Sequence, residues 1–178
     1  MGVNKPSGFT LIELVIGIVV FSIALVLFTS LVVPQAIRSV DPIFQVRASE
    51  LGKSLINEIA SKSFDEASDR TGGLVLCSAS VAPICTASGS LGAEEGLRQN
   101  FDDVDDYHNL NESGASIENS LGGTSGLYTG FNVQVTVVYD ASMDGITDTS
   151  IGNTKLITVT VSTPNDEDII FSTFRSNY

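Results

Sequence analysis

The feature that most constrains this chain is an apolar run of 25 residues at positions 9–33, which contains a single charge, Glu13. At 1.5 Å per residue, a helix of this length spans about 37 Å, enough to cross the hydrocarbon core of a bilayer with some tilt. A secretory signal peptide would have a cleavage site of the Ala-x-Ala kind after its apolar core, and none follows here. The sequence therefore predicts a membrane-spanning helix over residues 9–34.

The residues around and inside this run predict its orientation and raise a question about its charge. Residues 1–8 form a short polar leader that directly precedes the apolar run and contains the basic residue Lys5. By the positive-inside rule, the leader faces the cytoplasm and the chain after residue 34 lies outside the inner membrane. A carboxylate in a spanning helix costs about 2.5–3.5 kcal/mol, so Glu13 either lies close to the interface or has a partner.

Composition excludes several classes of function. The 178 residues include 9 basic and 21 acidic side chains, for a net charge of −12, which disfavours contact with nucleic-acid phosphates. With one histidine, two cysteines and no tryptophan, the chain is poorly supplied for a zinc site or a Ser/His or Cys/His active site. We expect one domain plus an anchor, with no enzymatic activity.

Residues 8–14, which read Gly-Phe-Thr-Leu-Ile-Glu-Leu, resemble the cleavage motif of type IV prepilins and of type II secretion pseudopilins. The resemblance implies that a prepilin peptidase cleaves after Gly8 and methylates the new amino group of Phe9. It also implies that Glu13 acts in assembly, pairing with the N-terminal amine of a neighbouring subunit. In a low dielectric, such an ion pair would satisfy Glu13 and set the axial register between subunits.

Later segments, at residues 34–36, 38–43, 45–48 and 101–108, resemble minor pilins of the mannose-sensitive haemagglutinin (MSHA) type. This resemblance implies a minor prepilin that is held in the bacterial inner membrane and then built into a pilus on the cell surface. The implied partners are other pilin subunits, the prepilin peptidase, the inner-membrane assembly machinery and the membrane. A type II secretion pseudopilin and a single-pass periplasmic binding module remain as alternatives.

The rest of the chain predicts one helix and a small sheet. Pro34 should kink or stop the first helix, and Asp41-Pro42 is typical of a helix start. Apolar residues then recur at spacings of three and four and form one helical face: Phe44, Ala48, Leu51, Leu55 and Ile59. Residues 74–77 are a short strand candidate, and residues 86–130 lack periodicity, which predicts a long loop region.

Alternating apolar residues predict strands near the C-terminus. Two apolar faces consist of Val133, Val135, Val137 and Tyr139, and of Ile157, Val159 and Val161. A third strand is expected over residues 168–174. The predicted fold is α+β: a long N-terminal transmembrane helix, as in type IV pilins, followed by a helix packed on a small antiparallel sheet. We expect a leader at 1–8, the transmembrane helix at 9–34, and a periplasmic or extracellular globular domain at 41–178.

The two cysteines, Cys77 and Cys85, enclose a loop of nine residues. Outside the inner membrane such a pair is usually oxidised, and the chain-entropy model gives about 2.5 kcal/mol of stabilisation for a loop of this size. A redox or metal role has less support, because there is no C-x-x-C spacing and no histidine partner. The sequence predicts a structural disulfide.

One acidic segment, residues 102–106, contains four carboxylates in five positions and is followed by His108. Oxygen-rich clusters suit Ca²⁺, but the usual outcome for such a charge run is a solvated turn, which we expect here. His108 alone makes no zinc site or general base and is predicted to be a surface or packing residue. Glu94 and Glu95 are adjacent carboxylates on the same loop region, with no apolar pocket residues predicted to raise a pKa.

A second acidic segment, residues 140–148, matches the first nine positions of a calcium loop. The predicted ligands are Asp140, Ser142, Asp144, the backbone carbonyl of Ile146, and Asp148. The twelfth position is Ile151 in place of the bidentate glutamate, so high affinity is not expected. A weak calcium site and an ordinary Asp/Gly hairpin loop both remain open, and no other cofactor is predicted.

Overall fold

The structure, a computed structural model, describes residues 8, 10–38, 41–68 and 75–178. The chain divides into two compact units, residues 1–42 and 43–178. The described residues do not include residues 1–7 of the predicted leader, among them Lys5, or Phe9.

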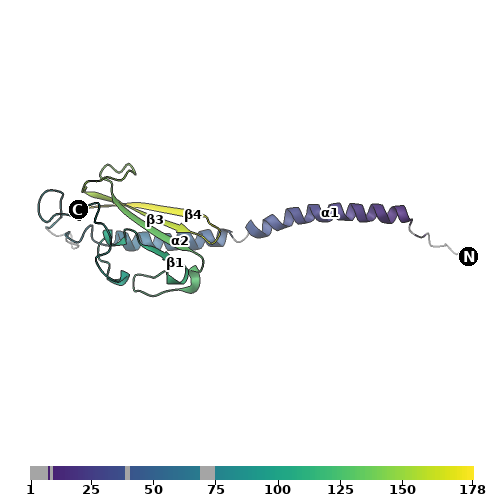
Figure 1. The fold of residues 1–178 in the computed structure, drawn as a ribbon, viewed down its shortest axis with the longest axis horizontal. Helices are drawn as coiled ribbons and strands as arrows, with labels where there is room; N and C mark the ends of the chain where they lie inside the picture. The colour runs from purple at the N-terminus through teal and green to yellow at the C-terminus, as the bar shows by residue number, and fades with distance from the viewer. Residues whose placement is uncertain (1–7, 9, 39–40, 69–74) are drawn as a thin grey trace, which may run out of the picture. The chain divides into compact units, whose positions relative to one another are not determined.

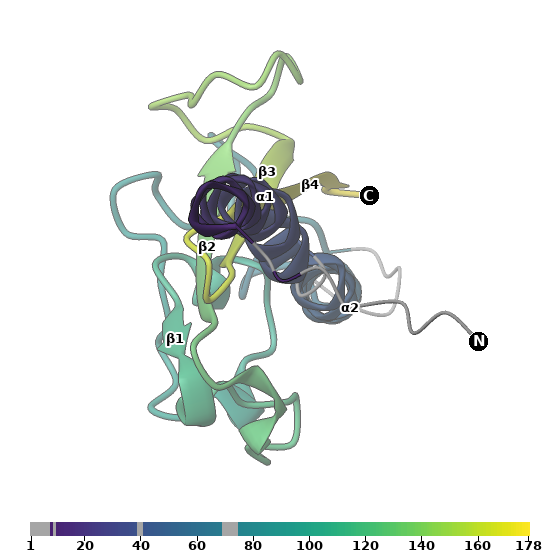
Figure 2. The ribbon, with the colours of Figure 1, turned by 90° about the vertical axis from the view of Figure 1, so that its right-hand side faces the viewer.

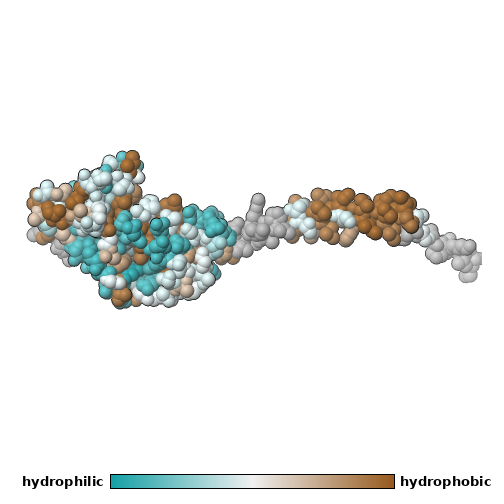
Figure 3. Space-filling view, viewed as in Figure 1, coloured by the Kyte–Doolittle hydropathy of each residue, from teal (hydrophilic) through white to brown (hydrophobic). Residues whose placement is uncertain are grey.

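The first unit contains helix α1, Leu11–Arg38. Among the described residues, one helix is long and apolar enough to cross a membrane, over Leu11–Val32, where the mean hydropathy is 2.9. The side chains of this stretch are exposed and give α1 an almost uniformly apolar surface (Figure 3). Pro34 does not end the helix, which continues for one more turn to Arg38. A proline removes one backbone donor, and here the helix persists despite that loss.

The second unit combines helix α2, Asp41–Ala60, with a four-stranded sheet (Figure 1). The strands are β1, Asn111–Ser113; β2, Asn132–Tyr139; β3, Thr154–Ser162; and β4, Asp168–Ser176. They are antiparallel and lie in the order β1-β2-β3-β4. The predicted α+β class is confirmed, and so are the three strands expected near the C-terminus.

The core lies between α2 and one face of the sheet. The register places Val135 of β2 opposite Val159 of β3, which in turn lies opposite Phe171 of β4, so the apolar faces of the three strands align. The predicted face of α2 packs on them, and Ala48, Leu51, Leu55 and Ile59 are buried there. Gly52 has no Cβ where the Phe171 ring passes close, which lets the helix approach β4.

The long loop region predicted at 86–130 is more ordered than its composition indicated. Figure 2 shows this part of the chain, in teal and green, gathered around β1. It contains four short 3₁₀ helices: Arg98–Asn100, Asp105–Tyr107, Gly114–Ser116 and Gly126–Tyr128. Single apolar side chains in and between them are buried in the core: Phe101, Val104, Tyr107 and Ile117. Three-residue helices carry no apolar period, so the pattern gave no sign of them.

The short strand expected at residues 74–77 is absent from the part that the structure describes. Residue 74 lies outside the described residues, and residues 75–77 belong to no strand. This stretch is instead held by the disulfide and by side-chain bonds. The Cys77 N–H donates to Ser68 Oγ at 3.1 Å, and Asn177 Nδ2 donates to the Cys77 carbonyl at 2.9 Å.

Candidate functional site

The N-terminal motif meets α1 at a capped helix start. Gly8 is exposed, and Thr10 immediately precedes the first helical residue, Leu11. The Glu13 N–H donates to Thr10 Oγ1 at 3.3 Å, as in the Thr-x-x-Glu capping pattern. Glu13 itself lies in the first turn of the helix, where the helix dipole favours a negative charge. No described residue forms a hydrogen bond or ion pair with the Glu13 carboxylate.

The hydroxyl groups of α1 are satisfied within the helix. Ser22 Oγ donates to the Ile18 carbonyl at 2.8 Å, and Ser30 Oγ donates to the Leu27 carbonyl at 2.8 Å. Thr29 Oγ1 lies 3.0 Å from two carbonyls of the preceding turn. Since backbone and side-chain donors are paired internally, these polar residues do not oppose a lipid environment.

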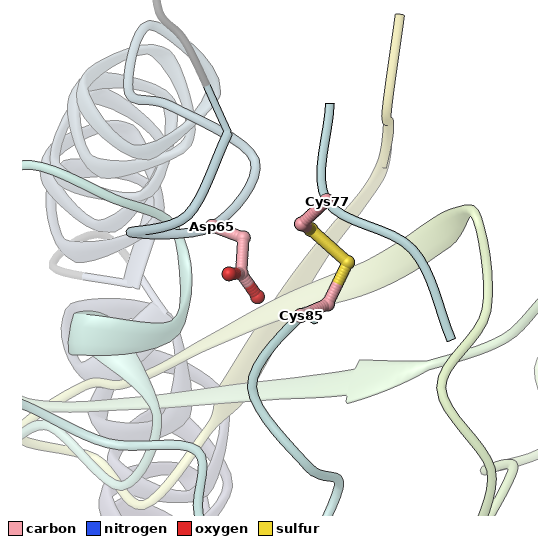
Figure 4. Close-up of side chains that lie close together, drawn as sticks. All are labelled: Asp65, Cys77 and Cys85. Atoms are coloured by element: carbon pink, nitrogen blue, oxygen red, sulfur yellow. A yellow bond between two sulfur atoms is a disulfide. The ribbon is translucent and has the colours of Figure 1, made fainter. Parts of the chain in front are cut away.

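Cys77 and Cys85 form a disulfide, with their Cα atoms 4.9 Å apart. Both are buried in a small second core with Phe64 and Tyr139. Figure 4 shows the Asp65 carboxylate beside this disulfide, a grouping of ligand types that a metal could use. Sulfurs in a disulfide are not thiolate ligands, however, and the Asp65 Oδ2 atom already accepts the Thr86 N–H at 2.9 Å.

A fully buried lysine, Lys155, pairs with the same Asp65 oxygen. Lys155 Nζ lies 2.6 Å from Asp105 Oδ1 and 3.2 Å from Asp65 Oδ2, and it donates to the Phe64 carbonyl at 2.7 Å. The ammonium group also lies 4.5 Å from the centre of the Phe64 ring and 5.3 Å from that of Tyr139. This ion network joins the loop after α2, strand β3 and the acidic segment at residues 102–106.

The acidic segment at 102–106 is not the solvated turn that its charge predicted. Asp103, Asp105 and Asp106 are at most 2% exposed. Asp106 Oδ2 accepts the N–H groups of Asp102 and Asp103 at 2.9 and 3.2 Å, which folds the segment around its own carboxylate. His108 is half-buried and accepts the Val137 N–H at Nδ1, 3.1 Å away, so it is a packing histidine as expected.

Burial perturbs the acidic groups in this region, contrary to the expectation for Glu94 and Glu95. Loss of solvent, with Asp106 close by, raises the pKa of Glu95 to about 7. Burial beside Asp105 and Asp106 raises the pKa of Asp103 to about 8. The pKa of Glu66 is also raised, chiefly by the charge of Asp102. No sequence pattern predicts this cluster, because its members come from three segments that only the fold brings together.

The predicted calcium loop at 140–148 closes on itself. Asp140 is fully buried, and its carboxylate accepts the N–H groups of Asp144 at 3.1 Å and Gly145 at 2.8 Å. Asp144 Oδ1 accepts the Ile146 N–H at 2.9 Å, and Asp148 Oδ2 accepts the Ala141 N–H at 2.8 Å. Among the described residues, these three carboxylates do not form a group with oxygens within 4.8 Å of one another. The arrangement is a hairpin loop ordered by aspartates, and the weak calcium site there stays a prediction.

Comparison with known proteins bears on the N-terminal segment alone. Residues 3–29 match the family model described as the prokaryotic N-terminal methylation motif. No curated protein and no solved structure matches the chain. The motif, the membrane-capable helix and the α+β globular domain together fit a membrane-anchored, type IV pilin-like protein.

Proposed function

We propose that this chain is a minor type IV prepilin, a structural subunit of an MSHA-like pilus with no enzymatic activity. The observation that carries the proposal is the methylation motif at residues 3–29. It contains the Gly8-Phe9 junction directly before an apolar helix, and Glu13 is the one charged residue at positions 11–32 of that helix. Prepilin peptidase would cleave after Gly8 and methylate the amino group of Phe9. The subunit would first span the inner membrane once, with its globular domain in the periplasm.

The surface of α1 supports assembly through this helix. Its large apolar side chains are exposed along the whole stretch, with Phe21 67% exposed, and its hydroxyls are paired internally. Such a surface is stable in lipid and equally suited to packing among the same helices of neighbouring subunits. Transfer from membrane to filament would therefore exchange one apolar environment for another. Other pilin subunits and the inner-membrane assembly machinery are the partners that this step requires.

Glu13 would act in this transfer. Its carboxylate has no partner among the described residues, and in lipid or in a helical bundle an unpaired charge is destabilising. Cleavage after Gly8 creates a cation at Phe9, close to the start of α1. Pairing between this amine and Glu13 of a neighbouring subunit would neutralise both groups and favour one axial register.

The first test concerns processing. Mass spectrometry of the protein extracted from membranes of the producing bacterium should find an N-terminal peptide that begins with methylated Phe9. A Gly8→Glu variant should keep residues 1–8, because the peptidase needs a small residue at this junction. An unprocessed wild-type N-terminus, or normal processing of the variant, would contradict the prepilin assignment and favour the membrane-anchored binding module.

A second test separates the two kinds of protein that share this motif. A pilin is recovered with filaments sheared from the cell surface, whereas a type II pseudopilin supports export of secreted enzymes. We expect the wild-type protein in the sheared fraction, and normal protein secretion after deletion of its gene. Loss of secretion with no protein in the sheared fraction would instead assign the chain to a secretion system.

A further inference from the structure

Five carboxylates from three chain segments meet at one place in the globular domain. Asp102 and Asp106 come from the acidic segment, Glu94 and Glu95 from the loop before it, and Glu66 from the loop after α2. Oxygens of Glu94, Glu95 and Asp106 all lie within 4.8 Å of one another, and so do those of Glu66, Glu95 and Asp102. Glu95 belongs to both groups and is the centre of this five-carboxylate cluster.

The floor of the cluster carries carboxylate oxygens that lack a donor. Asp106 is 2% exposed; its Oδ2 atom accepts two backbone N–H groups, whereas its Oδ1 atom is buried with no hydrogen-bond partner. The Oε2 atom of Glu95 is likewise buried and unpartnered. A carboxylate oxygen removed from water without a donor is strongly unfavourable, so this arrangement calls for a positive charge.

The protein's own buried cations are already engaged elsewhere. Lys155 pairs with Asp65 and Asp105, and Arg98 pairs with Glu58 at 3.1 Å and with Glu112 at 2.7 Å. Among the described residues, none of the five carboxylates forms an ion pair with a lysine or arginine. No cation among the described residues compensates the cluster, which leaves a proton shared between its carboxylates or a bound cation.

We propose that the five-carboxylate cluster binds a calcium ion. Carboxylate oxygens are hard ligands, and Ca²⁺ accepts six to eight of them at 2.3–2.6 Å in a flexible arrangement. Oxygens within 4.8 Å of one another can share one ion at such distances. Mg²⁺ fits less well, because it requires a smaller and nearly octahedral shell and retains several waters.

The cluster also provides a path for the ion. Glu66, Glu94 and Asp102 are exposed, Glu95 is half-buried, and Asp106 lies at the floor. A cation can therefore enter from solvent and be held more closely by the deeper groups. By joining the loops at 66, 94–95 and 102–106, it would link three segments that otherwise repel one another through like charges. The carboxylates of the described loop at 140–148 form no such group of oxygens within 4.8 Å of one another.

Terbium luminescence on the full-length protein in detergent micelles tests this site. Tb³⁺ takes oxygen ligands as Ca²⁺ does, and Tyr107, next to Asp106 in sequence, can sensitise it. We expect saturable Tb³⁺ emission that Ca²⁺ displaces, and a Ca²⁺-dependent rise in the melting temperature relative to EDTA. Glu95→Gln should weaken Ca²⁺ binding by about tenfold or more. Asp144→Asn, in the other acidic loop, is the matched control and should bind like the wild type.

Each other outcome overturns the proposal. Absence of saturable Tb³⁺ binding in the wild type would show that the cluster holds no cation. Loss of binding in Asp144→Asn, with Glu95→Gln unaffected, would move the calcium to the 140–148 loop. If Glu95→Gln does not fold, the exposed Glu94→Gln provides the same test, and unchanged affinity in that variant would contradict the cluster as the site.

Discussion

Helix α1 exposes apolar side chains, whereas the globular domain buries charged ones. On α1 the large apolar residues of Leu11–Val32 are exposed (Figure 3). In the globular domain Asp65, Asp105 and Lys155 are fully buried. In water-soluble proteins large apolar side chains are mostly buried and charged ones are mostly exposed, so each arrangement reverses the usual pattern. Each is stable only with something that compensates it: lipid or neighbouring helices for α1, and opposite charges for the buried groups.

The two regions also differ in where the compensating group comes from: the same chain, or a molecule outside it. Lys155 supplies its two aspartates with a cation from the same chain, within 3.2 Å. The exposed face of α1 and the five-carboxylate cluster have no such partner among the described residues. We therefore expect substitutions at internally compensated groups to change the stability of the globular domain, and substitutions on α1 to change assembly.

The largest stability effect is expected from Lys155→Met, which removes the cation and preserves the volume. Two fully buried carboxylates, Asp65 and Asp105, would lose their partner, and breaking a buried ion pair on one side costs about 3–5 kcal/mol. Urea unfolding of the full-length protein in detergent measures this loss. Lys53→Met, at an exposed position of α2, is the control and should change stability by less than about 0.5 kcal/mol. Equal stability of the two variants would show that the ion network contributes nothing.

A smaller loss is expected when the disulfide is removed. Cys77→Ser opens the loop of nine residues and should lower the free energy of unfolding by about 2–3 kcal/mol, with membrane insertion unchanged. The serine hydroxyl also lies in an apolar core formed with Phe64 and Tyr139, which adds to the loss. Non-reducing peptide mapping of exported protein should show the Cys77–Cys85 crosslink. Free thiols at both positions would rule out the structural role.

The smallest stability effect is expected at the hairpin loop. Asp140→Ala removes the acceptor for the N–H groups of Asp144 and Gly145, and such loop-ordering bonds contribute about 1 kcal/mol. Asp140→Asn retains one acceptor oxygen and should recover part of that loss. Chemical unfolding of the two variants with and without Ca²⁺ checks this. A loss that appears only when Ca²⁺ is present would identify the loop as a calcium site.

The sequence predicted those parts of the molecule whose residues are regularly spaced. The apolar run predicted a spanning helix, the spacing from Ala48 to Ile59 predicted the buried face of α2, and strict alternation predicted β2 and β3. In α2, β2 and β3 one face is apolar, so the periodicity indicates which face is buried, whereas in α1 the continuous apolar run indicates the helix itself.

Elements that depend on distant partners were not predictable in this way. The charge run at 102–106 is buried because Lys155, about fifty positions later, and the loops at Glu66 and Glu95 pack against it. Conversely, the segment at 140–148 has the spacing of a calcium loop, but its aspartates bind nearby N–H groups. Local spacing does not reveal which donors the fold brings to a carboxylate.

The most direct test of the proposed function is a comparison of membrane and sheared-filament fractions for the wild type and Glu13→Ala at matched expression. Without its carboxylate, α1 is more apolar, so the variant should be inserted and cleaved normally. It should accumulate in the membrane yet enter filaments poorly, because the ion pair with a neighbouring Phe9 amine is lost. Ser30→Ala, which removes a hydroxyl bonded within its own helix, should be incorporated like the wild type. Equal incorporation of Glu13→Ala, or absence of the wild-type protein from the filaments, would contradict the account.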